Sequence, residues 1–328
     1  MKKATLACLI GGAAWVLASA GMAAEPIRMR VNVFAGAQNV VIFAGLAKGI
    51  FAKHGLQVDL AFTPNSVAQR AGLANGEFEI AHAAVDNAVA MVELQSTDAV
   101  IVVGGDNSMQ GLYAQPGITS IADLRGKTVI MDAPNTAYAL VVKKILLNHG
   151  LVAGKDYNLA PAGGTFARLG LMKEKKEYAA TTLNPPFSIQ AEREGFVSLG
   201  LVTKLLGPYQ GQGGFVMRAW ARANAGILER YIQGYVESVR WVMAPANRAE
   251  AAALLAERLK IVPDLAVASL ERIISNGLAV DARLDSEGFR NLLAIRAEVE
   301  GTWGGRPPTP EKYLDLSYYD RALAALAR

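Results

Sequence analysis

One order of strands, loops and helices occurs twice along the chain, and this repetition constrains the fold more than any other feature. Apolar runs predict three strands in each copy, and a polar loop and a helical segment follow each strand. The expected strands lie at about residues 27–34, 56–62 and 78–84 in the first copy and at about 128–132, 157–161 and 178–183 in the second. Strands separated by helices form mainly parallel sheets with helices on both faces. The order therefore predicts two α/β lobes.

The first unit shows the pattern most clearly. Residues 27–33 and 56–62 alternate between apolar and polar side chains, which is the period of a strand. Between them, the small polar loop 35–39 leads into the apolar helical run 40–47, and Gly49 follows as a helix stop. A loop rich in backbone N–H groups between a strand and a helix N-terminus can bind a ligand. The pattern therefore predicts a ligand contact at this strand end.

Polar side chains follow most of the expected strands, at the point where each strand ends. Ligands in α/β folds bind beyond the carboxyl ends of parallel strands. Two lobes that face each other would place both sets of loops around one cleft. The candidate ligand-binding residues in these loops are Gln38, Asn39, Asn65, Ser66, Asp86 and Asn87 in the first copy, and Asn135, Thr136, Tyr138, Thr165, Arg168, Asn184 and Phe187 in the second.

Several of the first-copy candidates also suit a purely structural role. Asn39 could contact a ligand through its amide or cap the helix that follows it. Asn65 and Ser66 precede a helix expected to begin near Val67, whose N-terminus could present free N–H groups to an anion or simply be capped. Asp86 could attract an ammonium or hydroxyl group into the cleft, or cap the next helix. The sequence leaves these alternatives open.

In the second copy, ligand contact is the favoured interpretation at one loop. Asn135 and Thr136 open the helix that carries Tyr138, and these residues are expected to face the ligand. Phe187 follows a turn stiffened by two prolines and could pack against a ligand or only against the core. Arg168 could hold a carboxylate or sulfonate with two hydrogen bonds, although such an arginine is more often a surface ion-pair partner.

The chain is expected to cross between the two lobes twice, near residues 105–113 and 207–215. The first crossing follows an apolar strand, and the second is rich in glycine. Lobe 1 would then comprise residues 25–110 and 214–328, and lobe 2 would comprise residues 111–213. Two crossings of this kind could act as a hinge.

The C-terminal part of the chain has a helical pattern from Asn224 onward. Apolar side chains recur there at helical spacing, as is typical of helices that pack one face on a core. The aromatic residues of this part, Tyr231, Tyr235, Trp241 and Trp303, are expected to serve packing.

Four segments carry a resemblance to a known family, and they occur in the family's order. The segments are residues 49–56 (GIFAKHGL), 75–81 (NGEFEIA), 121–127 (IADLRGK) and 184–187 (NPPF). They resemble motifs of the nitrate/sulfonate/taurine type of periplasmic substrate-binding proteins of ABC importers, a group that includes relatives similar to thiamine-pyrimidine-precursor proteins. The resemblance implies a two-lobed periplasmic-binding-protein type II fold. Each lobe would be a mainly parallel sheet flanked by helices, with a helical C-terminal portion on the first lobe.

The resemblance also implies a function. The protein would be a receptor that closes its lobes on a small organic ligand, such as a sulfonate, a carboxylate or a heteroaromatic compound like a pyrimidine. It would act as a monomer, without a cofactor, and deliver the ligand to an ABC permease and its ATPase. The expected cleft loops are polar but poor in arginine and lysine. That composition favours a neutral or weakly charged organic ligand over nitrate.

The N-terminus predicts export from the cytoplasm. Residues 1–24 contain a basic start at 2–3 and an apolar run at 6–20, which together are typical of a secretory signal peptide. Small residues favour cleavage near Ala23 or Ala24. A membrane anchor is the alternative, but the run is short for a bilayer span of ~20 apolar residues. The predicted location is therefore the periplasm.

Composition excludes several other classes of protein. Cys8, in the expected signal peptide, is the only cysteine, so the mature chain could form no disulfide or thiolate site. The histidines at 54, 82 and 149 lack metal-ligand spacing. Without Lys2 and Lys3, 31 basic residues face 29 acidic ones, and this small excess argues against nucleic-acid binding.

Three alternatives to a transport receptor remain. The first is a sensory receptor, which would use the same cleft, and the sequence does not separate it from a transport protein. The second is an enzyme on the same fold, but no nucleophile–base pair or phosphate loop is visible, so catalysis is not expected. The third is an assembly module that has lost its ligand.

Overall fold

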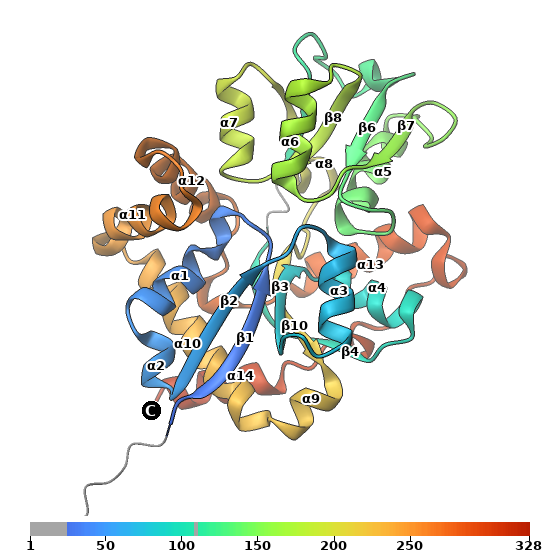
Figure 1. Ribbon diagram of the computed structural model, residues 1–328. Helices are drawn as coiled ribbons and strands as arrows, with labels where there is room; N and C mark the ends of the chain where they lie inside the picture. The colour runs from blue at the N-terminus through green and yellow to red at the C-terminus, as the bar shows by residue number, and fades with distance from the viewer. Residues whose placement is uncertain (1–24, 108–110) are drawn as a thin grey trace, which may run out of the picture.

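The computed structural model describes residues 25–107 and 111–328. These residues form two lobes, each built on one five-stranded sheet (Figure 1). We call the part built on the sheet of the first strand lobe 1 and the part built on the other sheet lobe 2. The signal peptide predicted at residues 1–24, with Cys8, lies outside the described residues. None of the helices within the described ranges has the length and apolar composition needed to cross a membrane.

The two sheets have corresponding strand orders. The described strands are β1 (Ile27–Val33), β2 (Leu56–Phe62), β3 (Ile80–Ala84), β4 (Ala99–Asp106), β5 (Gly111–Ala114), β6 (Thr128–Met131), β7 (Asn158–Pro161), β8 (Tyr178–Leu183), β9 (Val197–Leu201) and β10 (Gln212–Met217). The order is β2-β1-β3-β10-β4 in lobe 1 and β7-β6-β8-β5-β9 in lobe 2. One strand in each sheet, β10 or β5, runs antiparallel to its neighbours. The expected mainly parallel sheets are therefore confirmed.

The helices cover both faces of each sheet, as Figure 1 shows. They are α1 (Val40–Ala47), α2 (Ile50–Lys53), α3 (Ser66–Ala74), α4 (Asp86–Gln95), α5 (Ala137–Asn148), α6 (Thr165–Glu174), α7 (Phe187–Arg193), α8 (Val202–Leu206), α9 (Arg218–Ala223), α10 (Ala225–Met243), α11 (Arg248–Leu259), α12 (Pro263–Asn276), α13 (Ser286–Glu300) and α14 (Ser317–Leu326). The six strands expected from the sequence all form, within two residues of their predicted ends. Apolar runs bounded by polar loops were therefore a sufficient signal for them.

Strand β1 illustrates how the sequence pattern becomes packing. Met29, Val31 and Val33 are fully buried against the helices on one face of the first sheet. On the opposite side, the Nε atom of Arg30 donates to Glu79 over 3.0 Å, close to the surface. Burial of alternate side chains sets the register of the strand, because a shift of one residue would turn every apolar side chain toward water.

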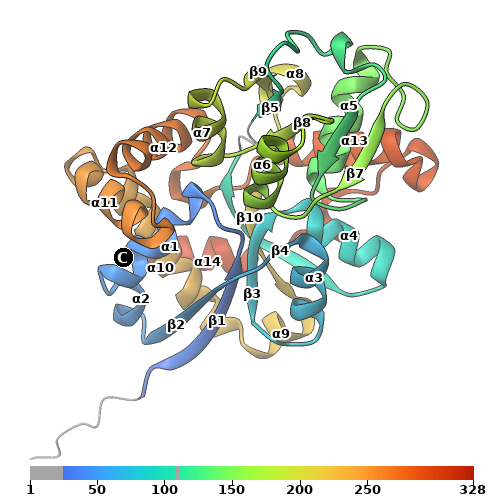
Figure 2. The ribbon, with the colours of Figure 1, turned by 45° about the horizontal axis from the view of Figure 1, so that its top comes forward.

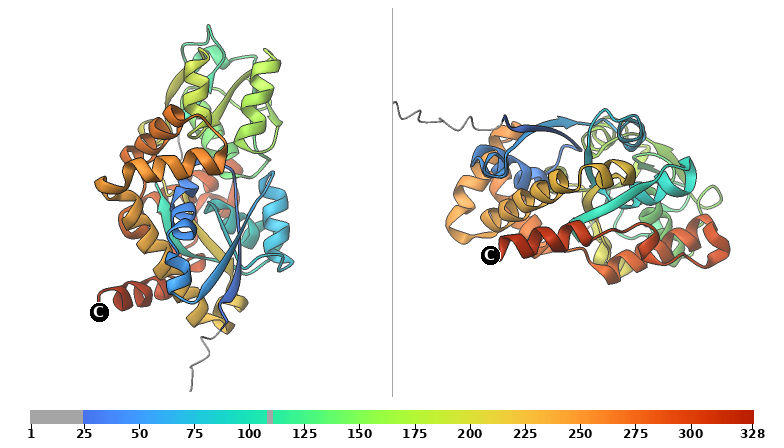
Figure 3. Two further views of the ribbon diagram at one scale, coloured as in Figure 1. Left: turned by 60° about the vertical axis from the view of Figure 1, so that its left-hand side comes forward. Right: turned by 90° about the horizontal axis from the view of Figure 1, so that it is seen from below.

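The helical C-terminal portion packs on lobe 1 through α10 and α14, with α14 far from lobe 2 (Figure 3). Tyr231 and Tyr235 of α10 are buried, and their ring centroids lie 5.8 Å and 4.6 Å from that of His82. Trp241 and Trp303 are half-buried and pack on the edges of the hydrophobic cores. The packing role predicted for these four aromatic residues is confirmed.

The C-terminal portion also reaches lobe 2, which the sequence did not suggest. Helix α12 lies beside α7, and α13 lies beside α5 (Figure 2). Arg272 of α12 forms a two-pronged ion pair with Glu192, with N–O distances of 2.9 Å and 3.0 Å. Lys143 of α5 pairs with Glu300 over 2.6 Å. The C-terminal helices therefore hold lobe 2 as well as lobe 1.

Candidate functional site

A small, largely enclosed polar cavity lies between the lobes. Its walls are formed by Phe34, Ser66, Ala83, Ala84, Asn87 and Gln212 from lobe 1 and by Tyr138, Asp132, Gly164, Thr165, Arg168 and Asn184 from lobe 2. Phe34, Asp132 and Asn184 each follow the last residue of a strand within one position. The cavity therefore lies beyond the carboxyl ends of the parallel strands, where α/β folds bind ligands.

The lobes touch each other on both sides of this cavity. The backbone N–H of Ala37 donates to the carbonyl of Pro185 over 2.9 Å, and the N–H of Gly164 donates to the carbonyl of Pro64 over 3.0 Å. Each bond joins one lobe to the other. The structure is therefore in a closed arrangement, with little of the cavity wall exposed to solvent.

Six of the thirteen predicted site residues line the cavity. They are Ser66, Asn87, Tyr138, Thr165, Arg168 and Asn184. Gln38 and Asn39 instead line a small neighbouring cavity, which is bounded by His82, Asp106 and Tyr235 and shares Gln212 with the first. The sequence thus predicted both lobes' contributions to one cleft, but not which polar side chains reach it.

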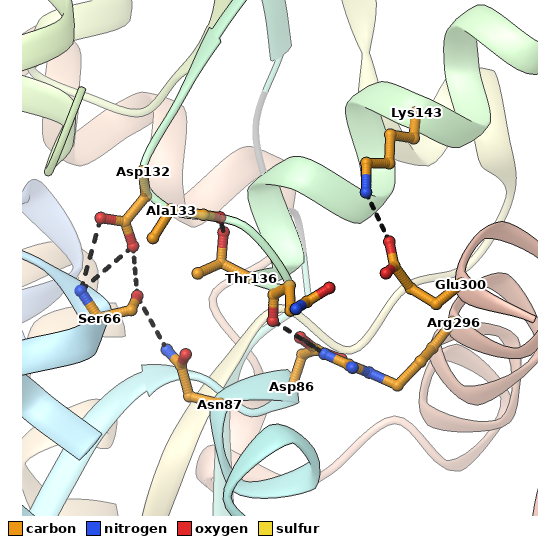
Figure 4. A network of polar contacts seen from close by, with 10 residues as sticks. Ser66, Asp86, Asn87, Asp132, Ala133, Thr136, Lys143, Arg296 and Glu300 are labelled. Atoms are coloured by element: carbon orange, nitrogen blue, oxygen red, sulfur yellow. Dashed lines mark hydrogen bonds and ion pairs between the residues drawn. The ribbon is translucent and has the colours of Figure 1, made fainter. Parts of the chain in front are cut away.

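The remaining predicted residues have structural roles. Asn65 caps α3, because its Oδ1 accepts from the N–H of Ala68 over 2.8 Å. The Thr136 hydroxyl donates to the carbonyl of Ala133 over 2.8 Å (Figure 4). Phe187 packs edge-on against Phe166, with centroids 6.0 Å apart. None of these three side chains lines the interlobe cavity.

Two of the structural alternatives are also wrong. Asn39 occupies the N-cap position of α1, but its side chain donates to the carbonyl of Phe34 and makes no cap hydrogen bond. Asp86 does not cap α4, because it lies within the first turn and pairs with Arg296 of α13. That partner is distant in sequence, so no local pattern could have indicated it.

Asp86 and Arg296 form a fully buried ion pair below the cavity (Figure 4). The two N–O distances are 2.8 Å and 2.6 Å, and Nη2 of Arg296 also donates to the carbonyl of Asn135 in lobe 2 over 3.1 Å. Burial alone would lower the pKa of Arg296, but the adjacent Asp86 carboxylate raises that pKa above its usual value. The pair is therefore charged and joins the lobes.

Arg168 is a buried cation in the wall of the cavity. Its guanidinium donates to the hydroxyl of Thr181 and to the carbonyls of Gly163 and Thr182, at 2.7 Å to 3.0 Å, and lies 4.9 Å from the ring centroid of Tyr138. Burial lowers its pKa. The interpretation of Arg168 as a surface ion-pair partner is wrong, because no carboxylate of the described residues forms an ion pair with it and its side chain is inaccessible to solvent.

Asp132 is the most important residue that sequence reasoning missed. It follows β6 in lobe 2 and accepts from the N–H of Ser66 over 3.3 Å and from the Ser66 hydroxyl, across the cleft (Figure 4). Asn87 then donates to that hydroxyl oxygen over 3.3 Å. Its position could have indicated it, because Asp132 is the last residue of the strand expected at 128–132, and the site was expected at such strand ends.

Two amide oxygens at the cavity have no hydrogen-bond partner. They are Oδ1 of Asn87 and Oδ1 of Asn184, and both side chains are about 98% buried. The other end of Asn184 donates to Gln38 over 3.4 Å. A buried polar atom without a partner costs about 1–3 kcal/mol, so these acceptors favour a ligand that donates hydrogen bonds.

No group of three or more histidine, aspartate or glutamate side chains is arranged to hold a metal ion in residues 25–107 and 111–328.

Comparison with known proteins identifies the family. The model of the family described as NMT1/THI5 like matches residues 37–205, which is more than half of the chain. No curated protein sequence matches the chain. A solved structure from Bordetella bronchiseptica RB50 has 17% identity and a TM-score of 0.80, and the match covers 93% of this chain and 99% of that one.

Two further solved structures carry names that describe their ligands. The periplasmic nitrate-binding protein NrtA from Synechocystis PCC 6803 has 14% identity and a TM-score of 0.77, over 92% of this chain and 89% of that one. The alkanesulfonate-binding protein SsuA from Xanthomonas axonopodis pv. citri, bound to MOPS, has 16% identity and a TM-score of 0.69, over 88% and 96%. The chain therefore belongs to the NMT1/THI5-like family and has the type II periplasmic-binding-protein fold of solute-binding proteins of ABC import systems.

Proposed function

We propose that this protein is a periplasmic receptor whose two lobes close on a small organic ligand and deliver it to an ABC permease and its ATPase. The observation that carries the proposal is the polar cavity between the lobes, with side chains from both lobes in its wall. Ligand contacts made only when both walls are in place would favour the closed state. The same proposal includes a cleaved signal peptide at residues 1–24 and a monomeric state. It also assigns residues 25–110 and 214–328 to lobe 1 and residues 111–213 to lobe 2.

The ligand class follows from the side chains around the cavity. The relatives with named ligands bind nitrate or an alkanesulfonate, so sulfonates and carboxylates are included with heteroaromatic compounds as candidates. We favour a neutral or weakly charged organic ligand, because the wall is dominated by amides, hydroxyls and aromatic rings. Tighter binding of nitrate than of every organic compound tested would contradict this choice.

We also propose that the protein is a receptor and not an enzyme, although the same fold is known to carry enzymes. The lining residues include no histidine, cysteine or lysine that could act as a base or an amine nucleophile. Among the lining residues, the only hydroxyl hydrogen-bonded to a carboxylate is that of Ser66, and its oxygen already accepts from Asn87.

A thermal-shift screen of residues 25–328 tests the receptor proposal. The panel contains sulfonates, nitrate, aliphatic and aromatic carboxylates, pyrimidines and purines. A ligand at about 100 times its dissociation constant stabilises the folded state by roughly 2.7 kcal/mol, which gives a clear rise in melting temperature. One class should give a saturable rise. A protein shown to be ligand-free that responds to no class would count against the proposal.

For the ligand found in that screen, Asn184→Ala is expected to raise the dissociation constant about 5-fold to 150-fold. The substitution removes a buried acceptor at the cavity, and losing one such partner costs about 1–3 kcal/mol. Isothermal titration calorimetry measures the change. Asn158→Ala is the matched control, because Asn158 is exposed on β7 and should leave affinity unchanged. Equal affinities for the two variants would exclude Asn184 from the binding site.

A further inference from the structure

The N-terminus of α3 bears on the charge of the ligand that the cleft can accept. A helix N-terminus attracts anions because its first N–H groups lack partners within the helix and the helix dipole is positive there. The N-terminal residue of α3, Ser66, is 1% exposed and lines the interlobe cavity. An anionic ligand in the cleft could accept hydrogen bonds at this helix end.

That position is already occupied by a carboxylate of the chain itself. Asp132 reaches across from lobe 2 and accepts from both the backbone N–H and the hydroxyl of Ser66 (Figure 4). It is 2% exposed, so its charge is held inside the closed cleft. A second anion beside it would be repelled by this charge, since charges of like sign close together in a protein interior raise the free energy.

The acceptors that remain in the cavity also favour donors on the ligand. Oδ1 of Asn87 and Oδ1 of Asn184 are buried without partners, and both residues line the cavity with Asp132. Three residues that carry oxygen acceptors therefore line one small space. Arg168, the cation of the lobe 2 wall, already donates hydrogen bonds to oxygen atoms of Gly163, Thr181 and Thr182.

We propose that Asp132 determines specificity: it fills the anion position at the N-terminus of α3 and restricts the cleft to neutral ligands with N–H or O–H donors. Specificity often depends on a repulsive element as well as on attractive contacts, and a fixed carboxylate is such an element. The inference deepens the proposed receptor function, from which it takes the cleft as the binding site. It separates this chain from its relatives named for binding nitrate or an alkanesulfonate.

Acetate and acetamide are suitable probes, because they have nearly the same shape and differ in charge and in N–H donors. For the wild-type protein, ligand-observed NMR titration at constant ionic strength should show at least fivefold tighter binding of acetamide than of acetate. Acetate binding as tightly as acetamide, or more tightly, would overturn the inference. This comparison needs no variant, so it does not depend on the folding of any substituted protein.

Asp132→Ala provides the complementary test. Removing the carboxylate leaves a space beside the α3 N-terminus that a small carboxylate from solution can fill. Formate should then raise the melting temperature of Asp132→Ala, with binding at least tenfold tighter than to the wild type. Asp132→Asn keeps the volume filled, so it should gain little formate binding. Asp156→Ala removes a carboxylate near the surface, close to Arg125, and should show no gain.

The results of these titrations separate the inference from the receptor proposal. Equal formate binding by the wild type and by Asp132→Ala would overturn the inference, even if the ligand screen finds an organic ligand. Formate binding gained only by Asp132→Ala would support it, even if no organic ligand is found and the receptor proposal fails.

Discussion

Replacing Asp86 with alanine is expected to lower the free energy of unfolding by about 3–5 kcal/mol, the largest effect of a single substitution that we anticipate. The change leaves the guanidinium of Arg296 in the interior without its carboxylate. Both side chains are at most 1% exposed, so water cannot replace the lost partner. Urea unfolding at pH 7, followed by circular dichroism, measures the change.

Two controls make this measurement specific to the buried pair. Arg125→Ala breaks an ion pair whose arginine is 59% exposed, and such pairs contribute roughly 0–1 kcal/mol. The double variant Asp86→Ala/Arg296→Met removes both charges and should recover part of the loss. If Asp86→Ala costs no more than Arg125→Ala, the buried pair does not stabilise the folded state to the extent expected.

The second large effect expected is a pH dependence that originates in His82. Its imidazole is buried, with Nε2 2.9 Å from the hydroxyl of Tyr231 and its ring centroid 4.6 Å from that of Tyr235. Burial lowers the pKa of His82 from 6.5 to about 3. The unfolded chain takes up a proton below pH 6.5, while the folded chain does not until about pH 3. Neutral His82 therefore does not reduce the free energy of unfolding above pH 6.5, and the folded state loses stability through this group as pH falls below that value.

The size of this effect can be compared between variants. Each pH unit between 6.5 and 3 should cost the folded state about 1.4 kcal/mol through this one group. His82→Gln should therefore lose about 2.3 kcal/mol less than the wild type between pH 6.5 and 4.5, whatever its stability at neutral pH. His149→Gln, at an exposed helix end, is the control. Its free energy of unfolding should change with pH as that of the wild type does. If the free energy of unfolding of His82→Gln depends on pH as that of the wild type does, His82 is not protected from protonation in the folded state.

Local sequence patterns predicted most of the fold, because the signals are short-range. The strands at 56–62 and 178–183 have the predicted bounds, since a period-two alternation or a short run of buried residues is visible within seven residues. The return of the chain to lobe 1 was marked by a run of glycines between 207 and 214. The direction of β10 and β5, which run against their neighbours, followed only from how the chain packs between the lobes.

The cleft was predictable only in part. Its place beyond the strand ends follows from the geometry of parallel sheets, so Ser66, Asn87 and Asn184 were found in loops that the sequence had already singled out. Which end of each side chain faces the cavity depends on neighbours from the other lobe. Gln212 lines the cavity although it lies in the glycine-rich crossing, where nothing in the local pattern distinguishes it.

The sequence by itself determined the two-lobed α/β order, the family and the general position of the binding cleft, since periodicity, turns and motifs act over a few residues. Only the tertiary structure decided the partners of the charged groups. Asp86 pairs with a residue 210 positions away, and Asp132 meets Ser66 across 66 positions. Such pairs form because a buried charge must find a partner wherever the fold brings one close, and sequence distance has no influence on that requirement.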